Sequence, residues 1–178
     1  MLKIISIKDI AKTIDEGYKV YIIVRALGKA KSLVDDKSVF YLPDLSPSFR
    51  LLNMKRAWDQ CGAWNQDAFI EGFAPEYMLE LQGKQQKTAM NKIWHDAIEG
   101  NVALACFCPD ETLCHRSLLL GIFQAYEGFP AERSAERNYS PYFLMYAQAR
   151  KGQLKFSDYH DSLLKVRPAP SEKPITLF

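Results

Sequence analysis

The residues of this chain that are best suited to catalysis or metal binding lie close together in the sequence. Cys106 and Cys108 are followed by Cys114, His115 and Arg116. A thiolate is a nucleophile and a soft metal ligand, and an imidazole moves protons or binds metal ions. A guanidinium group binds phosphate or carboxylate through a planar fork of donors. The combination indicates an enzyme site that binds an anion, or a metal site.

On the first interpretation, this stretch is the reaction centre of an enzyme. Arg116 and Ser117 lie where a helix is expected to begin, so their side chains and the backbone amides there favour an anionic substrate. Cys114 or Cys108 is the expected nucleophile, and His115 is expected to move a proton. The arrangement is similar to that of cysteine phosphatases in architecture only, because the spacing between Cys108 and Arg116 is longer than theirs.

On the second interpretation, the same residues hold a metal ion. Cys106, Cys108, Cys114 and His115 are the right number and type of ligands for zinc. Two cysteines separated by one residue in a strand face the same side, which favours the site. Adjacent ligands such as Cys114 and His115 point apart unless the turn between them is tight, and the usual two-residue ligand spacing is absent.

A third interpretation is purely structural. Free cysteine behaves as a small hydrophobic residue, and Cys106 ends a segment that is expected to be buried. His115 is then a residue at a helix end, and Arg116 is paired with Asp110 or Glu111. The sequence alone leaves the three interpretations open.

The elements around this stretch predict where it lies in the fold. Short apolar segments predict strands at 2–6, 20–24, 39–42 and 101–105. Helical spacing of apolar residues predicts helices at 8–16, 49–60, 65–81, 85–99 and 117–126, the third with an interruption near Gly72 and Pro75. This alternation is typical of an α/β fold with three layers and a small, at least partly parallel sheet. The cysteines then follow the carboxyl end of a strand, where ligands bind in open α/β sheets.

Length and composition limit the remaining possibilities. The 178 residues suffice for one α/β domain, expected over 1–150, and the proline-containing segment 151–178 is expected to be a peripheral extension with little structure. The net charge of +2 does not favour a strongly basic nucleic-acid-binding protein. No stretch has the length of a membrane span and no signal peptide is evident. We therefore expect a cytoplasmic protein with reduced cysteines and no membrane partner.

The cysteine motif and its upstream residues resemble the domain-of-unknown-function 488 family. Members carry a strand ending in cysteine, a short acidic loop, then Cys-His-Arg and a leucine-rich helix; residues 104–108 and 114–119 correspond to these parts. Weaker correspondences are Arg25 after the second strand, the Leu-Ser-Pro-Ser turn at 45–48, and the pair Phe69 and Tyr77. The resemblance covers residues 18–127.

The resemblance implies a compact single-domain α/β fold and assigns no reaction. This chain departs from the family pattern in two places: the loop after Arg25 lacks the expected prolines, and the chain after Tyr126 has no recognisable counterpart. Some relatives are described as nucleic-acid repair proteins, which favours a nucleotide or nucleic-acid-derived ligand.

Together these observations predict an enzyme that acts on a nucleotide or nucleic-acid-derived substrate, as a thiol-dependent hydrolase or transferase at a phosphate- or sugar-bearing centre. Arg25 and Ser48 join Arg116 and Ser117 as expected substrate contacts, although Ser48 also fits a helix cap. No cofactor is expected, with zinc as the alternative. The alternatives to an enzyme are a non-catalytic module that binds or sequesters a nucleotide, and a zinc-stabilised interaction protein.

Overall fold

A parallel sheet forms the centre of the computed structural model, which describes residues 1–166. The strands lie in the order β1-β4-β2-β3, and each neighbouring pair is parallel. Their bounds are Leu2–Ser6 for β1, Lys19–Ile22 for β2, Val39–Tyr41 for β3 and Val102–Cys106 for β4. The prediction of an α/β fold with a small, at least partly parallel sheet is confirmed.

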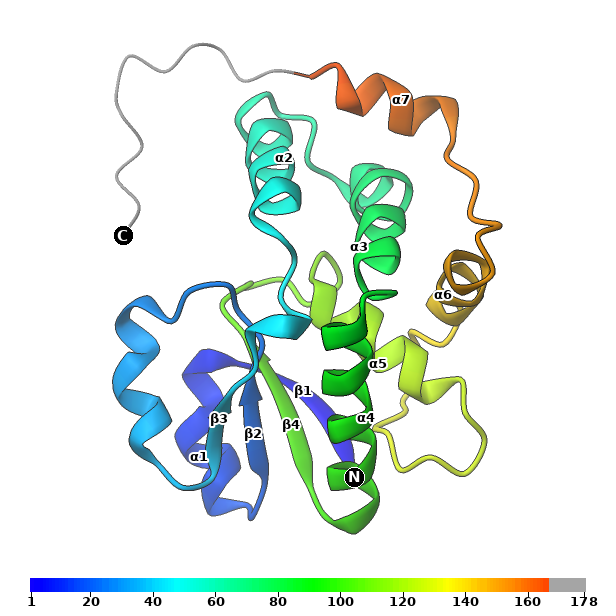
Figure 1. Cartoon of the computed structure of the whole chain (residues 1–178). Helices are drawn as coiled ribbons and strands as arrows, with labels where there is room; N and C mark the ends of the chain where they lie inside the picture. Colours follow the sequence, from blue (N-terminus) through cyan, green and yellow to red (C-terminus); the bar gives the residue numbers. More distant parts are fainter. Residues whose placement is uncertain (167–178) are drawn as a thin grey trace.

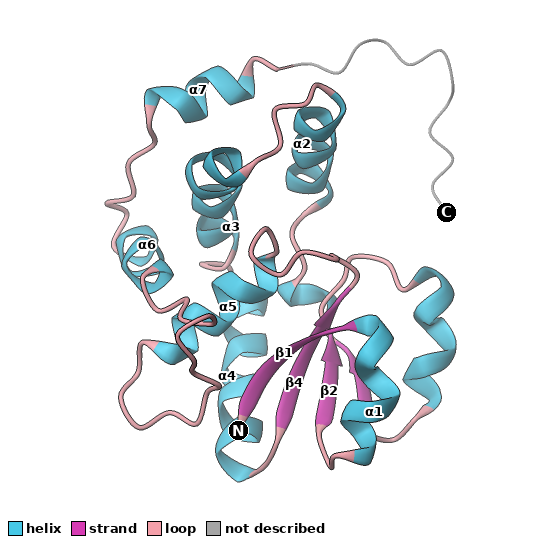
Figure 2. Ribbon diagram, turned by 180° about the vertical axis from the view of Figure 1, so that it is seen from behind, coloured by secondary structure: helices cyan, strands magenta, loops and turns pink. Residues whose placement is uncertain are grey.

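Helices cover both faces of this sheet (Figures 1 and 2). Alternate strand residues face opposite sides, so Tyr21 and Leu104 belong to one buried cluster while Val20 and Ala103 belong to the other. The first cluster packs against α4 (Lys84–Glu99) and α5 (His115–Gln124), and the second against α1 (Ile10–Asp15) and the 3-10 segment η2 (Gly28–Asp35). Because β4 is central and covered on both faces, all of its residues are buried.

The remaining helices lie beyond the carboxyl ends of the strands (Figure 1). They are α2 (Phe49–Gln60), the π-helical segment η4 (Ala68–Phe73), α3 (Ala74–Glu80), α6 (Tyr142–Arg150) and α7 (Asp158–Leu164), and two short 3-10 segments, η1 (Ile7–Asp9) and η3 (Pro43–Leu45), follow strands. The π-helical segment interrupts the helix predicted over 65–81. Pro75 has no amide hydrogen to complete the α-helical pattern, and the Ala74 amide bonds the Phe69 carbonyl instead.

Helix α7 corrects the prediction that the chain has little structure from Lys151 on. Residues 158–164 are helical, and both His160 and Leu163 are buried. The Trp58 indole donates a hydrogen bond of 2.9 Å to the Leu163 carbonyl, which ties α7 to α2. The predicted proline-containing end at 167–178 lies outside the described residues, and the division of the chain at residue 150 stays a prediction.

Within residues 1–166, none of the helices combines the length and the apolar character needed to cross a bilayer.

Candidate functional site

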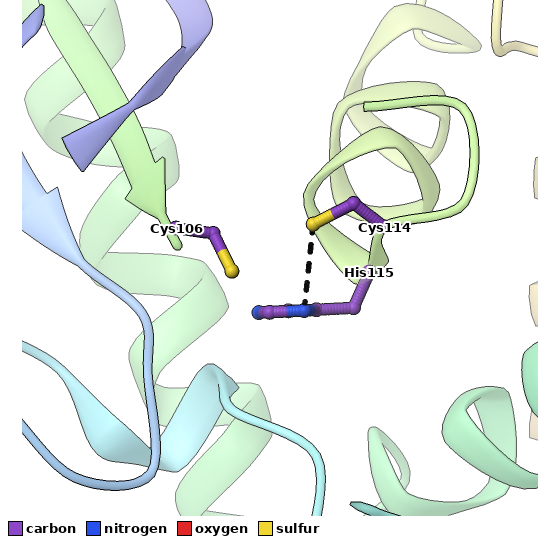
Figure 3. A group of neighbouring side chains, drawn as sticks. All are labelled: Cys106, Cys114 and His115. Carbon is purple, nitrogen blue, oxygen red and sulfur yellow. Dashed lines mark hydrogen bonds between the residues drawn. The ribbon is translucent and has the colours of Figure 1, made fainter. Parts of the chain in front are cut away.

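The end of β4 and the start of α5 bring the predicted cysteines and histidine together. Figure 3 shows the side chains of Cys106, Cys114 and His115 pointing toward one another across the space between the two elements. One ligand atom from each of these residues lies within 4.8 Å of the others, and all three residues are buried. Cys108 joins them, because its sulfur lies 3.6 Å from that of Cys106. We call these four residues the cysteine cluster.

Local backbone geometry explains why adjacent residues converge here. Cys114 is the N-cap of α5 and has extended dihedral angles, φ −126° and ψ 140°, whereas His115 is the first helical residue. The chain turns sharply between them, so the Cys114 sulfur lies 3.8 Å from Nδ1 of His115. The objection that neighbouring side chains point apart therefore does not apply to this pair.

Hydrogen bonding defines the state of the His115 ring. Its Nε2 lies 2.8 Å from the Ile23 carbonyl, at the end of the adjacent strand β2. A carbonyl can only accept, so Nε2 carries the hydrogen. Burial lowers the pKa of His115, which keeps the ring neutral and leaves a lone pair on Nδ1 facing Cys114. The ring of Tyr77 packs edge-on against the imidazole, with ring centres 5.6 Å apart.

The three thiols of the cluster differ in exposure and in charge preference. Cys106 and Cys114 are buried, while Cys108 is half-buried. The hydrogen bond from the Cys106 thiol to the Cys108 sulfur lowers the pKa of Cys108 and raises that of Cys106 to about 12. Burial raises the pKa of Cys114. Of the three, Cys108 is the one that both favours the thiolate and approaches solvent.

Arg116 follows the cluster residue His115 and is a buried cation that bonds main-chain carbonyls. Its side chain is buried and donates to the main-chain carbonyls of Ile5 and Cys106, at 3.0 and 3.2 Å. Its Nε has no hydrogen-bond partner among residues 1–166. The pairing with Asp110 or Glu111, considered from the sequence, does not form. Asp110 accepts from Thr112 instead, and Glu111 pairs with Arg137.

The other predicted substrate contacts also have partners inside the protein. The buried Ser117 hydroxyl donates to the Cys114 carbonyl at 2.7 Å. Arg25 is half-buried and donates to the carbonyls of Ser46 and Pro47, at 2.6 and 3.1 Å. Ser48 caps α2 and donates from its amide and its hydroxyl to Glu80. Their roles in substrate binding stay predictions.

Sequence reasoning missed the residues that hold the loop between Cys108 and Cys114. Glu111 in this loop accepts two hydrogen bonds from Arg137, at 2.7 and 2.8 Å, and one from the Tyr139 hydroxyl at 3.0 Å. Arg137 also bonds both carboxylate oxygens of Glu132. The only sequence signal was the acidic character of the loop, which indicates a cationic partner without identifying it.

Comparison with known proteins shows a match to one family model. The model of the DUF488-N3a family, described as the active DUF488-N3 subclade, matches residues 2–127. The match includes all four strands and the whole cysteine cluster. No curated protein and no solved structure gives a significant match.

Proposed function

The chain belongs to the DUF488 family, and on this premise we propose that it is an enzyme acting on a nucleotide or nucleic-acid-derived substrate. The proposed reaction is a thiol-dependent hydrolysis or group transfer at a phosphate- or sugar-bearing centre. Cys108 attacks as the thiolate, and the Cys114 thiol and the His115 imidazole are the groups that give a proton to the leaving group and take one back from the water or acceptor that releases the enzyme. The matched subclade is described as active, which favours catalysis over sequestration.

The exposure of Cys108 within an otherwise buried cluster carries this proposal. Its sulfur is the half-buried member of the set and follows the carboxyl end of the central strand β4. Ligands of open parallel sheets bind at this edge. Cys114 and the Nδ1 atom of His115, 3.8 Å apart, then form a buried route for a proton behind the nucleophile.

Arg25 supports an anionic, ring-bearing substrate. It follows β2, next to β4, is half-buried, and donates from Nε and one terminal nitrogen of its guanidinium group to the carbonyls of Pro47 and Ser46. The same group lies 5.7 Å from the centre of the exposed Phe49 ring. A cation beside an exposed aromatic ring suits a phosphate linked to a planar base.

The test is a screen of purified protein against nucleoside mono-, di- and triphosphates and short oligonucleotides, with products followed by chromatography and mass spectrometry. The wild type should convert one class, Cys108→Ser should lose turnover, and Cys61→Ser should retain it. Cys61 is exposed at the end of α2 and serves as the matched thiol control. Turnover that persists in Cys108→Ser would exclude the proposed nucleophile.

The same screen distinguishes the sequestering module. That alternative predicts tight nucleotide binding without conversion by the wild type. Binding would then survive Cys114→Ser and be lost in Arg116→Ala. Absence of both binding and conversion across the panel would contradict the nucleotide proposal itself.

A further inference from the structure

We propose that the cysteine cluster is a zinc site in which Cys106, Cys114 and His115 are three ligands and Cys108 is the fourth. This inference goes beyond the proposed function and does not depend on it, because it rests on the geometry and charge of the cluster alone. The donor set, three thiolates and one imidazole, is a combination found in structural zinc sites. Soft sulfur ligands in a tetrahedral arrangement favour zinc over magnesium or calcium.

Two separations between donor atoms match a tetrahedral ion, and Cys108, which lies outside the group of three within 4.8 Å of one another, moves toward that group to complete the site. Bonds of about 2.3 Å to sulfur and about 2.0 Å to nitrogen imply sulfur–sulfur edges of about 3.8 Å and sulfur–nitrogen edges of about 3.5 Å. The observed separations are 3.6 Å between the Cys106 and Cys108 sulfurs and 3.8 Å between the Cys114 sulfur and Nδ1 of His115. Cys106, Cys114 and His115 also lie within 4.8 Å of one another as a group.

His115 is already oriented as a metal ligand. A ligating imidazole commonly donates its second ring hydrogen to a carbonyl or carboxylate, which fixes the tautomer and directs the free nitrogen at the metal. Nε2 of His115 lies 2.8 Å from the Ile23 carbonyl, and Nδ1 faces the sulfur of Cys114 (Figure 3). The carbonyl comes from the residue after β2, so the ring is held by the sheet and not by a mobile side chain.

The charge of Arg116 is compatible with a zinc-loaded cluster. A buried cation is costly unless a counter-charge lies nearby, and within residues 1–166 no carboxylate forms an ion pair with this side chain. Three thiolates, a neutral imidazole and a divalent ion carry a net charge of −1. Arg116 donates to the main-chain carbonyl of Cys106 and interacts electrostatically with the Cys108 thiolate and with Asp110, so a zinc-loaded cluster of net charge −1 keeps a counter-charge beside this guanidinium group.

Zinc in this position also has a consequence for the thiols. Coordination deprotonates a bound cysteine outright, so metal binding releases the thiol protons and holds all three sulfurs as thiolates. Cys108 would then be the ligand nearest solvent, and Cys106 and Cys114 would anchor the ion from within. The site joins a strand end to a helix start, which gives the ion a direct role in stabilising the loop between them.

The experiment uses the full chain, purified under reducing conditions without a histidine tag. Elemental analysis should find about one equivalent of zinc per chain. After exchange for cobalt(II), the spectrum should show thiolate-to-metal charge-transfer bands and the intense d–d bands of a tetrahedral ion. Chelation should expose Cys106, Cys108 and Cys114 to alkylation, mapped by mass spectrometry, while Cys61 reacts equally with and without metal.

Substitutions identify the ligands. Cys114→Ser and Cys106→Ser should lower zinc affinity by more than the roughly 10- to 100-fold expected for loss of an outer-shell partner. Cys108→Ser should retain zinc with lower affinity and a weaker charge-transfer band, and Cys61→Ser should match the wild type. Far-ultraviolet circular dichroism checks that each variant folds. If a buried variant does not fold, the wild-type spectrum and alkylation pattern still decide the question.

Two results would overturn the zinc site. One is wild-type protein that contains no zinc, acquires no cobalt thiolate bands and shows the same alkylation with zinc as with chelator. The other is a Cys106–Cys108 disulfide in freshly purified protein, because sulfurs joined in a disulfide are not thiolate ligands for zinc. All of these measurements are made without substrate, so their failure is distinguishable from failure of the proposed function. A confirmed zinc site would replace the proton-transfer role proposed for Cys114 and His115, and Cys108 would then react as a zinc-bound thiolate.

Discussion

Arg116 and Arg137 are held in opposite ways in the two regions that meet at helix α5. Arg116, in the cysteine cluster region, is buried. Among the described residues 1–166 it bonds only main-chain carbonyls, and its Nε has no partner there. Arg137, in the C-terminal segment that follows the family match, is half-buried and bonds the carboxylates of Glu111 and Glu132. The charge of Arg137 is balanced within the protein, which is typical of a structural role. Within residues 1–166 the charge of Arg116 has no carboxylate in an ion pair, and its electrostatic partners include the Cys108 thiolate of the cysteine cluster itself.

The two regions are also connected. Glu111 belongs to the loop that carries the cluster from β4 to α5, and its partners Arg137 and Tyr139 belong to residues 128–166, the C-terminal segment. The segment therefore holds the loop from outside while the cysteine cluster holds it from inside. Residues 128–166 therefore support the site without contributing a sulfur or an imidazole to it.

The largest effect is expected from removal of the buried charge of Arg116. Arg116→Ala leaves the carbonyls of Ile5 and Cys106 without their charged donor, which should destabilise the protein by about 3 kcal/mol. Thermal unfolding should show this as a fall in Tm of roughly 10 °C. It should also weaken anion or metal binding, because the counter-charge of the cluster is lost.

Arg133→Ala is the matched control for this variant. Arg133 also donates to carbonyls only, those of Gln124, Tyr126 and Phe129 near the end of α5, but it is exposed. Its loss should cost less than about 1 kcal/mol. Equal Tm values for the two variants would show that the buried Arg116 contributes no more to stability than the exposed Arg133.

The second effect is at the junction of the regions. A Cβ at Gly121 of α5 would lie 2.1 Å from the carbonyl oxygen of Tyr139, so Gly121→Ala must push the C-terminal segment away. We expect a net loss of about 2 kcal/mol in urea unfolding, despite the better helix propensity of alanine. Gly100→Ala is the control, because its Cβ would meet only ordinary contact at 3.9 Å. A neutral Gly121→Ala would mean that the segment is not packed firmly on α5.

Local patterns explain how much of this could be predicted. The passage from β4 to α5 follows from a continuous apolar run, turn residues and a second apolar run, all within a short stretch, and the cluster residues lie in that same stretch. The parallel sheet follows from the alternation of strands and helices. These features depend on neighbours in sequence, so the sequence could predict them.

The features that could not be predicted depend on distant contacts. The hydrogen-bond partner of His115 is a carbonyl 92 positions away, and the partner of Glu111 is 26 positions away. Helix α7 is short, and its stability comes from burial of His160 and Leu163 and from the bond between Trp58 and the Leu163 carbonyl. A charge or a short amphipathic stretch does not indicate which distant residue will pair with it.

A smaller effect is expected from the balanced charges of the C-terminal segment. A double-mutant cycle of Glu111→Gln and Arg137→Gln should give a coupling energy of about 1 kcal/mol, because the pair is bidentate but partly exposed to solvent. Chemical denaturation of the four proteins measures it. The Cys108 alkylation rate should rise in both single variants, since the loop is held less firmly. A coupling energy near zero would show that Glu111 and Arg137 do not anchor the loop.

The smallest effect concerns Asp96 of α4, whose carboxylate is hydrogen-bonded to Lys19 and Tyr21 of β2. Burial alone would raise the pKa of Asp96, but hydrogen bonds from Tyr21, Lys19 and Lys92 together lower it. The folded state therefore favours the ionised carboxylate, and its stabilising contribution is complete above the unfolded pKa of about 3.9. That contribution is lost as the pH falls through the lower pKa of the folded state.

The difference in unfolding free energy between the wild type and Asp96→Asn isolates this contribution from other acidic groups. It should stay constant and below about 1 kcal/mol from pH 7 to pH 5, because these charges are screened by solvent. Below pH 4 it should shrink toward zero. A difference that grows as the pH falls would mean that the folded state favours the protonated Asp96. A carboxylate paired with cations would then not stabilise the fold in its ionised form, as we propose for the pairs of Arg137.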